Sequence, residues 1–242
     1  MDTKQVNINW KDGTLPFRCF DNGLSLKTAR DIFAGKIYKP VPLLSDVKLI
    51  ADIGANVGAA SVYLHLQYPE ARIVAAEPSP AAFGLLAENV RRFSLIEPRQ
   101  TGLYDKKAKL PLHEGHIDGT TSSFGASAMA KRGGEVFELE DAAGFFTREG
   151  LLSADIIKLD TEGCEWPILK SLEPWLGRFQ VIYMEYHSDT DRRRIDALLE
   201  PTHLLQGGKA LHPDRGEFCY LARSALPADS AHARMEITPP QL

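Results

Sequence analysis

Short apolar runs and longer apolar stripes alternate along most of the chain, which predicts strands alternating with helices. The expected strands lie at 49–51, 72–76, 99–104, 156–160 and 180–186, and the expected helices at 57–68, 80–90, 165–172 and 191–199. Two further runs, 204–205 and 218–222, are expected to close the sheet as an antiparallel pair. This alternation predicts an α/β fold with a mostly parallel sheet and helices on both faces.

The segments outside this core have a different character. Residues 1–45 are expected to form an N-terminal extension, a hairpin followed by a helix. Residues 113–134 are rich in glycine, serine, threonine and histidine, which is typical of a loop. Residues 224–242 contain several prolines and are expected to form a loose tail. The core domain is therefore predicted to span 46–223.

The segment DIGANVG, residues 52–58, follows the first core strand and precedes a helix. Gly54 and Gly58 carry no Cβ, so the backbone can turn tightly there and approach a ligand closely. Glu77 ends the next strand, where a carboxylate can accept hydrogen bonds from both hydroxyls of a ribose. Together these features predict a site for a nucleoside cofactor.

The spacing of the glycines favours one cofactor over another. Dinucleotide folds usually carry G-x-G-x-x-G, which holds a pyrophosphate, whereas this chain has G-x-x-x-G. Asp52 precedes the first glycine by two residues and suits a cationic amino-acid ligand, whose ammonium it can orient through the loop or a water. We therefore expect S-adenosylmethionine. An NAD-linked oxidoreductase is the alternative, and the missing third glycine disfavours it.

Three carboxylates gather where the strand at 156–160 ends. Asp160, Glu162 and Glu165 lie within six residues of one another and repel unless a cation is nearby. That cation can be a sulfonium, a metal, Lys158 or the N-terminus of the following helix. Asp160 is expected to be functional, because ligands bind beyond the carboxyl ends of parallel strands. Glu165 is expected to cap the helix instead.

Glu185 and His187 end the next expected strand. They are two residues apart, so both side chains point to one face of the strand. His187 is a candidate general base that takes a proton from an attacking hydroxyl, with Asp160 as the alternative. Asp160 and Glu185 could also hold a divalent metal, although two carboxylates on adjacent strands do not by themselves prove a site.

Composition limits the kinds of partner. The chain has 242 residues, the size of one α/β domain with additions, and its net charge is −4. Without a long basic run, no nucleic-acid partner is expected. The three cysteines form no disulfide or zinc pattern, and no apolar run reaches the ~20 residues that span a bilayer. We therefore expect a cytoplasmic protein that acts on a small molecule away from membranes.

Three motifs together resemble those of the FkbM-type methyltransferases, a class I family that depends on S-adenosylmethionine. The motifs are DIGANVG at 52–58, EPSP at 77–80 followed by Phe83, Leu86 and Asn89, and IKLDTEGCE at 157–165. Thr161 and Cys164 stand where the family usually has valine and alanine. The resemblance runs from Leu49 to Ala222, most of the chain.

The resemblance implies a Rossmann-like fold and methyl transfer to a hydroxyl of a sugar, polyketide or other secondary metabolite. The cofactor contacts that it implies are Asp52, Gly54, Asn56, Gly58, Glu77, Asp160 and Glu162. It also implies an acidic active-site edge made of Asp160, Glu162 and Glu185. Residues 1–45 are expected to shape the acceptor pocket. N- or C-methylation of a small molecule and a nucleoside-binding domain without chemistry stay open as alternatives.

Overall fold

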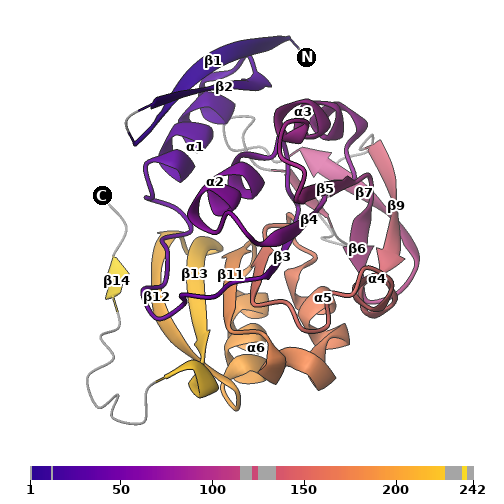
Figure 1. Cartoon of the computed structure of the whole chain (residues 1–242). Helices are drawn as coiled ribbons and strands as arrows, with labels where there is room; N and C mark the ends of the chain where they lie inside the picture. Colours follow the sequence, from indigo (N-terminus) through magenta and orange to yellow (C-terminus); the bar gives the residue numbers. More distant parts are fainter. Residues whose placement is uncertain (1, 12, 115–121, 125–134, 227–235, 239–242) are drawn as a thin grey trace.

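The structure is a computed structural model that describes residues 2–11, 13–114, 122–124, 135–226 and 236–238. Its largest sheet has eight strands and is mixed. Its strand order is β14-β12-β13-β11-β10-β3-β4-β5. Strands β12, β13, β11, β3 and β4 can be followed across the sheet in Figure 1. The eight strands are β3 (Leu49–Ile53), β4 (Arg72–Ala76), β5 (Ile96–Arg99), β10 (Ile156–Leu159), β11 (Val181–Tyr186), β12 (His203–His212), β13 (Arg215–Ala222) and β14 (Glu236–Thr238). Strands β5, β4, β3, β10 and β11 pair in parallel, whereas β13 is antiparallel to both of its neighbours. The predicted α/β fold, including its closing antiparallel pair, is confirmed.

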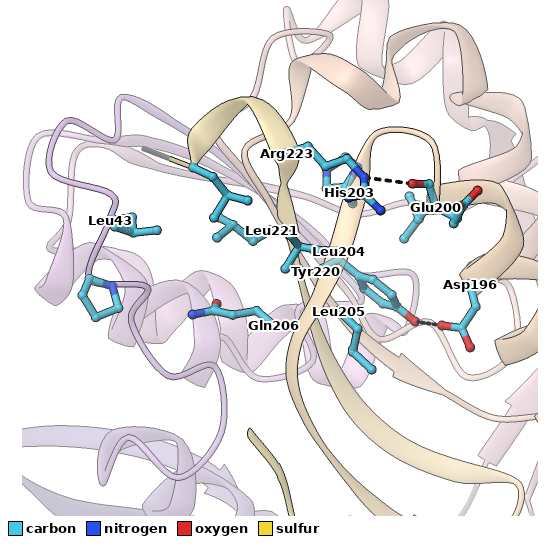
Figure 2. Close-up of a pocket in the computed structure, with 13 residues that line it drawn as sticks. Leu43, Asp196, Glu200, His203, Leu204, Leu205, Gln206, Tyr220, Leu221 and Arg223 are labelled. Carbon is cyan, nitrogen blue, oxygen red and sulfur yellow. Dashed lines mark hydrogen bonds between the residues drawn. The ribbon is translucent and has the colours of Figure 1, made fainter. Parts of the chain in front are cut away.

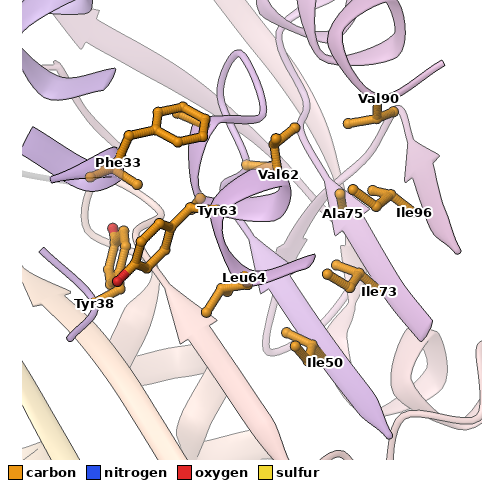
Figure 3. Packing of buried hydrophobic residues seen from close by; sticks show 14 of the residues in the cluster. Phe33, Tyr38, Ile50, Val62, Tyr63, Leu64, Ile73, Ala75, Val90 and Ile96 are labelled. Atoms are coloured by element: carbon orange, nitrogen blue, oxygen red, sulfur yellow. The ribbon is translucent and has the colours of Figure 1, made fainter. Parts of the chain in front are cut away.

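Successive side chains of each central strand enter two separate cores. Ile156 packs beneath α1, α2 and α3, whereas its neighbour Ile157 packs beneath α4, α5 and α6. The helices are α1 (Gly23–Phe33), α2 (Ala59–Gln67), α3 (Pro80–Val90), α4 (Ala142–Arg148), α5 (Glu165–Ser171) and α6 (Asp189–Leu199). Figure 3 shows the first core, where side chains of α1 and α2 meet those of β3 and β4. Because both faces are covered, these strands are apolar runs without alternation.

The N-terminal extension forms the expected hairpin and helix. Strands β1 (Thr3–Trp10) and β2 (Gly13–Phe20) pair antiparallel, and α1 follows them. The hairpin lies on the outer side of α1, as Figure 1 shows, while α1 packs against α2 and β2 lies against α3. Phe17 of β2 is buried in the first core. The extension therefore shares the core of the sheet domain.

Asn89 ties the hairpin to the rest of the molecule. Its Oδ1 accepts a hydrogen bond from the Arg18 backbone N–H at 2.8 Å, and its Nδ2 donates to the Arg18 carbonyl at 2.8 Å. The same Nδ2 donates to the Val57 carbonyl at 2.8 Å. One buried side chain of α3 thus joins the hairpin to the loop between β3 and α2.

A second sheet differs from the sequence-based expectation. It has the order β6-β9-β7-β8, with β6 (Gly102–Tyr104), β7 (Ala108–Glu114), β8 (Ser122–Phe124) and β9 (Glu135–Asp141). The single strand expected at 99–104 is two strands in different sheets, because the chain turns where the Thr101 N–H donates to the Arg99 carbonyl. The loop expected at 113–134 is wrong for β8 and for the end of β7. Its residues 115–121 and 125–134 lie outside the described part.

The C-terminal segment also differs from a simple tail. Strand β14 pairs in parallel with β12 at Gly207–Lys209, and a short 3₁₀ turn spans Arg223–Ala225. The remaining tail residues, 227–235 and 239–242, lie outside the described part. Among the described residues, no helix combines the length and apolar content that a membrane span requires.

We predict that Asn89→Ala lowers the free energy of unfolding by about 2–3 kcal/mol, because it leaves buried backbone groups of the hairpin and the loop unsatisfied. Urea denaturation followed by circular dichroism measures this change. Asn9→Ala, on an exposed position of β1, is the matched control and should change stability by less than about 0.5 kcal/mol. Equal stability of the two variants would contradict the role given to Asn89.

Candidate active site

A cavity of about 310 Å³ lies at the carboxyl ends of the central strands. Predicted site residues that line it are Gly54, Asn56, Glu77, Asp160 and Glu162. Three other strands complete the wall: β2 of the hairpin contributes Phe20, and β6 and β9 of the second sheet contribute Leu103 and Phe137. The sequence motifs thus meet at one enclosed site, as expected for the ligand-binding edge of a parallel sheet.

The loop after β3 adopts left-handed backbone conformations that explain its glycines. Gly54 has φ +80°, and a Cβ there would lie 1.8 Å from the Asp160 carbonyl oxygen. Gly58 has φ +87°, and a Cβ there would lie 2.7 Å from a methyl group of Leu86. Asn56, with φ +49°, is the remaining left-handed residue of the loop. Gly54 is therefore required because the loop passes directly against the end of β10.

Glu77 lies at the end of β4 and holds the same loop. Its Oε2 accepts a hydrogen bond from the Asn56 N–H at 2.8 Å, and its Oε1 accepts one from the Ser79 N–H at 2.8 Å. Burial raises the pKa of Glu77 to about 7, although these two hydrogen bonds favour the charged form. Each oxygen has a further lone pair, so the carboxylate can also accept hydrogen bonds from a ligand's hydroxyls.

Asp52 lies beneath the loop rather than on the cavity wall. It is fully buried, its Oδ2 accepts a hydrogen bond from Ser61 Oγ at 2.5 Å, and its Oδ1 lies 3.1 Å from Lys158 Nζ. Asp52 does not line the cavity, so its expected effect on a cofactor can act only through the loop and Lys158.

Lys158 is the buried cation of the site. Its Nζ donates to the Gly54 carbonyl at 2.5 Å and lies 3.9 Å from Asp160 Oδ2. Burial alone would lower the pKa of Lys158, but the carboxylates of Asp52 and Asp160 outweigh it and raise the pKa, so the ammonium stays charged. The sequence predicts Lys158 only as one of several cations that could offset the carboxylates at the end of this strand. Its pairing with Asp52 follows from the register of β3 and β10, in which the two residues are direct partners.

His187 lies among several carboxylates. Its Nδ1 is 3.2 Å from Glu165 Oε1, and its Nε2 is 3.2 Å from Glu162 Oε2 and 3.8 Å from Glu185 Oε1. Burial would lower the pKa of His187, but Glu165 and Glu162 reverse this and raise it well above its usual value. These carboxylates therefore favour positive charge at the ring, carried either by a proton or by a bound metal ion. A protonated ring does not fit the general-base role expected for His187.

Glu165 is structural, but it holds the turn before α5 rather than capping the helix as expected, because this helix start has no side-chain cap hydrogen bond. It also makes one additional contact. It is the first residue of α5, and its carboxylate accepts hydrogen bonds from the Thr161 N–H at 2.8 Å and the Gly163 N–H at 3.1 Å. These bonds close the turn after β10. The addition is the contact with His187 Nδ1, which fixes the orientation of the imidazole ring.

Glu185 and Arg215 pair at the ends of β11 and β13. Arg215 Nε donates a hydrogen bond to Glu185 Oε1. Burial and the nearby Asp160 carboxylate raise the pKa of Glu185 to about 8 in spite of this guanidinium. Arg215 was not identified from the sequence, because nothing in its local pattern shows that β13 runs antiparallel beside β11. Carboxyl groups still outnumber cationic side chains here, and that balance suits a cationic ligand.

A larger cavity, of about 730 Å³, lies elsewhere and contains none of the predicted site residues. It adjoins the start of β12 and the end of β13, which pair near the amino end of β11. Figure 2 shows that its polar groups bond to one another: Tyr220 Oη donates to Asp196 Oδ1 at 2.5 Å, and Arg223 Nε donates to the Glu200 carbonyl. This cavity lies at the end of the sheet opposite to the predicted site residues. The smaller cavity is therefore the candidate active site.

We predict that Lys158→Met lowers the free energy of unfolding by about 3–5 kcal/mol, because Asp52 then becomes a buried charge without a cationic partner. Chemical denaturation measures the change. The control is Lys170→Met, since Lys170 is a half-exposed lysine that pairs with Glu173, and the substitution should have an effect below about 1 kcal/mol. A Lys158→Met protein as stable as the control would show that the buried ion pair does not support the loop.

Comparisons with known proteins identify the family of this chain. The model of the methyltransferase FkbM domain matches residues 52–206. Methyltransferase sdnD of Sordaria araneosa is 28% identical over 204 residues, 71% of this chain and 78% of that protein. The 2-O-methyltransferase NoeI of Sinorhizobium fredii is 25% identical over 177 residues, 67% of this chain and 70% of that protein.

Among solved structures, Aeropyrum pernix fibrillarin with bound S-adenosyl-L-methionine has a TM-score of 0.47 and 13% identity, covering 81% of this chain and 74% of that chain. The family match spans more than half of the chain and sets the NAD-linked alternative aside. The chain belongs to the FkbM methyltransferase family and is an S-adenosylmethionine-dependent methyltransferase.

Proposed function

We propose that this enzyme methylates a hydroxyl group of a small molecule, such as a sugar, a polyketide or another secondary metabolite. Asp160 carries the proposal, because its carboxylate lines the cavity and is 25% exposed. Among the described residues, its side chain accepts no hydrogen bond, and its nearest cations lie 3.9 and 4.0 Å away. The name of NoeI, a 2-O-methyltransferase, supports the same class of acceptor.

The residues around the cavity fit the cofactor. Glu77 is suited to the ribose hydroxyls, and the loop from Gly54 to Gly58 is suited to the close approach of a nucleoside. Asp160 and Glu162 supply negative charge for the sulfonium and the ammonium group. When bound, S-adenosylmethionine supplies a methyl group attached to a positively charged sulfur.

The protein's part in the reaction is to orient the acceptor and to take its proton. An alcohol is a weak nucleophile until a base accepts its proton. Three other carboxylates of the site have hydrogen-bond partners, because Glu77 and Glu165 hold backbone N–H groups and Glu185 holds Arg215. Glu162 also lines the cavity, but its Oε2 lies 3.2 Å from His187 Nε2. Asp160 is therefore the proposed base. The acceptor O–H bond breaks toward Asp160, the new O–CH₃ bond forms, and the methyl–sulfur bond breaks with its electron pair on sulfur.

The extension at residues 1–45 supports a small acceptor enclosed by the protein. Phe20 lines the cavity, and Lys158 Nζ lies 5.9 Å from the centre of the Tyr38 ring. Both aromatic residues belong to the extension, which agrees with its proposed role in shaping the acceptor pocket.

We predict that Asp160→Asn reduces turnover by about 10²–10⁴-fold, because the amide cannot accept the proton. Radiolabelled S-adenosylmethionine with a panel of glycosides and hydroxylated polyketides provides the assay, and NMR of the product locates the methyl group. Asp46→Asn, on an exposed aspartate far from the cavity, is the control. Methyl groups found on nitrogen or carbon, or an Asp160→Asn enzyme with full turnover, would contradict the proposal.

We predict that Glu77→Gln weakens binding of S-adenosylhomocysteine by about 10–100-fold, because one of the two carboxylate oxygens that accept backbone and ribose hydrogen bonds becomes an NH₂ group, which only donates. Isothermal titration calorimetry measures the affinity, with Glu70→Gln on the surface as the control. Because the pKa of Glu77 is about 7, wild-type affinity should also fall as the pH drops below 7, when the protonated carboxyl loses acceptor capacity. The Glu77→Gln variant should lack this part of the pH dependence, and identical pH profiles would contradict the ribose role.

A further inference from the structure

We propose that Asp160, Glu185 and His187 form a binding site for one divalent metal ion beside the cofactor cavity. Each residue offers one ligand atom, and these three atoms lie within 4.8 Å of one another. The inference deepens the proposed function and rests on it for the role of the metal, although the binding itself can be tested separately.

The nitrogen His187 Nε2 is the observation that points to a ligand. The side chain is 6% exposed, and Nε2 has no hydrogen bond of acceptable geometry among the described residues. The nearest oxygen, Glu162 Oε2, is 3.2 Å away and is itself without a hydrogen bond. Buried polar atoms without partners are costly, and a metal ion at this point would satisfy the nitrogen.

Glu165 holds the imidazole in the orientation that a metal ligand needs. Its Oε1 lies 3.2 Å from His187 Nδ1, on the opposite side of the ring from the cluster. Metal-bound histidines usually donate their other ring N–H to a carboxylate, which fixes the tautomer. In this arrangement Nδ1 carries the hydrogen, and Nε2 faces Asp160 at 4.0 Å and Glu185 at 3.8 Å.

The donor set favours a particular class of ion. Two carboxylates suit magnesium, calcium and manganese, while an imidazole nitrogen favours later first-row metals. One nitrogen with two oxygens therefore points to Mn²⁺ or Fe²⁺ rather than Ca²⁺. Asp160 borders the cavity, so the remaining coordination positions can be taken by water or by the acceptor hydroxyl.

Arg215 opposes the proposed ion and must be accounted for. Its guanidinium donates to Glu185 Oε1 and adds a positive charge to the cluster. The second oxygen of Glu185 stays available, and Glu162 adds a further carboxylate within 3.2 Å of His187 Nε2.

The metal would help the acceptor to react. A hydroxyl bound to a divalent cation loses its proton more easily. Asp160 would accept that proton, and the acceptor oxygen would form the new bond to the methyl group as the methyl–sulfur bond of the cofactor breaks. No oxidant or reductant is needed, because neither the metal nor the acceptor changes oxidation state.

The test is a titration of the full chain with Mn²⁺ alone, followed by electron paramagnetic resonance of the free ion. We predict one bound Mn²⁺ per chain, and a loss of affinity of at least tenfold in His187→Gln. The matched control, His212→Gln, changes an exposed histidine and should bind as the wild type does. If His187→Gln does not fold, Asp160→Asn tests the same site, since that side chain accepts no hydrogen bond among the described residues. No binding at millimolar Mn²⁺, or equal binding by the His187 and His212 variants, would overturn the proposal.

Failure of this inference can be separated from failure of the proposed function. Hydroxyl methylation that continues undiminished in EDTA would overturn the metal's role in the reaction and leave the proposed function standing, whereas the Mn²⁺ titration decides whether the metal site exists. Mn²⁺ bound at this site, in a protein that methylates only nitrogen or carbon, would overturn the proposed function and leave the site standing. Calorimetry with S-adenosylhomocysteine in both experiments confirms that the cofactor site is intact.

Discussion

The buried ammonium of Lys158 links the parts of the active site. It contacts Asp52 at the end of β3, donates to the Gly54 carbonyl in the glycine loop and lies 3.9 Å from Asp160. Two carboxylates and a carbonyl oxygen can remain this close in a buried place only because a positive charge lies between them. One side chain thus fixes both the glycine loop, which is the proposed cofactor site, and Asp160, which is the proposed base.

The elements of the sheet domain could be predicted from the sequence because their signals are local. Apolar runs mark the strands, and Ser79 and Pro80 mark the start of α3, where Ser79 caps the helix as expected. The second sheet was missed for the opposite reason. Its strand β9 buries only alternate residues such as Phe137 and Leu139, and β8 has three residues, so neither forms an apolar run.

The residues of the candidate site likewise fall into those that a local pattern predicts and those that only the fold brings together. The loop glycines and Glu77 belong to two short motifs, each at the end of a strand, so the sequence alone predicts them as candidates. Arg215 and the partners of His187 depend on which strands lie side by side, which no local pattern records. The surrounding acids raise the pKa of His187, which argues against it as the general base, and that environment is visible only in three dimensions.

A crystal structure of the protein with S-adenosylhomocysteine would directly test whether the nucleoside binds in the cavity beside Glu77. We predict that the ribose hydroxyls lie within hydrogen-bonding distance of Glu77 and that the sulfur faces Asp160. Lys158 should still contact Asp52 and the Gly54 carbonyl. The nucleoside bound away from Glu77, for example in the larger cavity beside β12 and β13, would contradict this prediction.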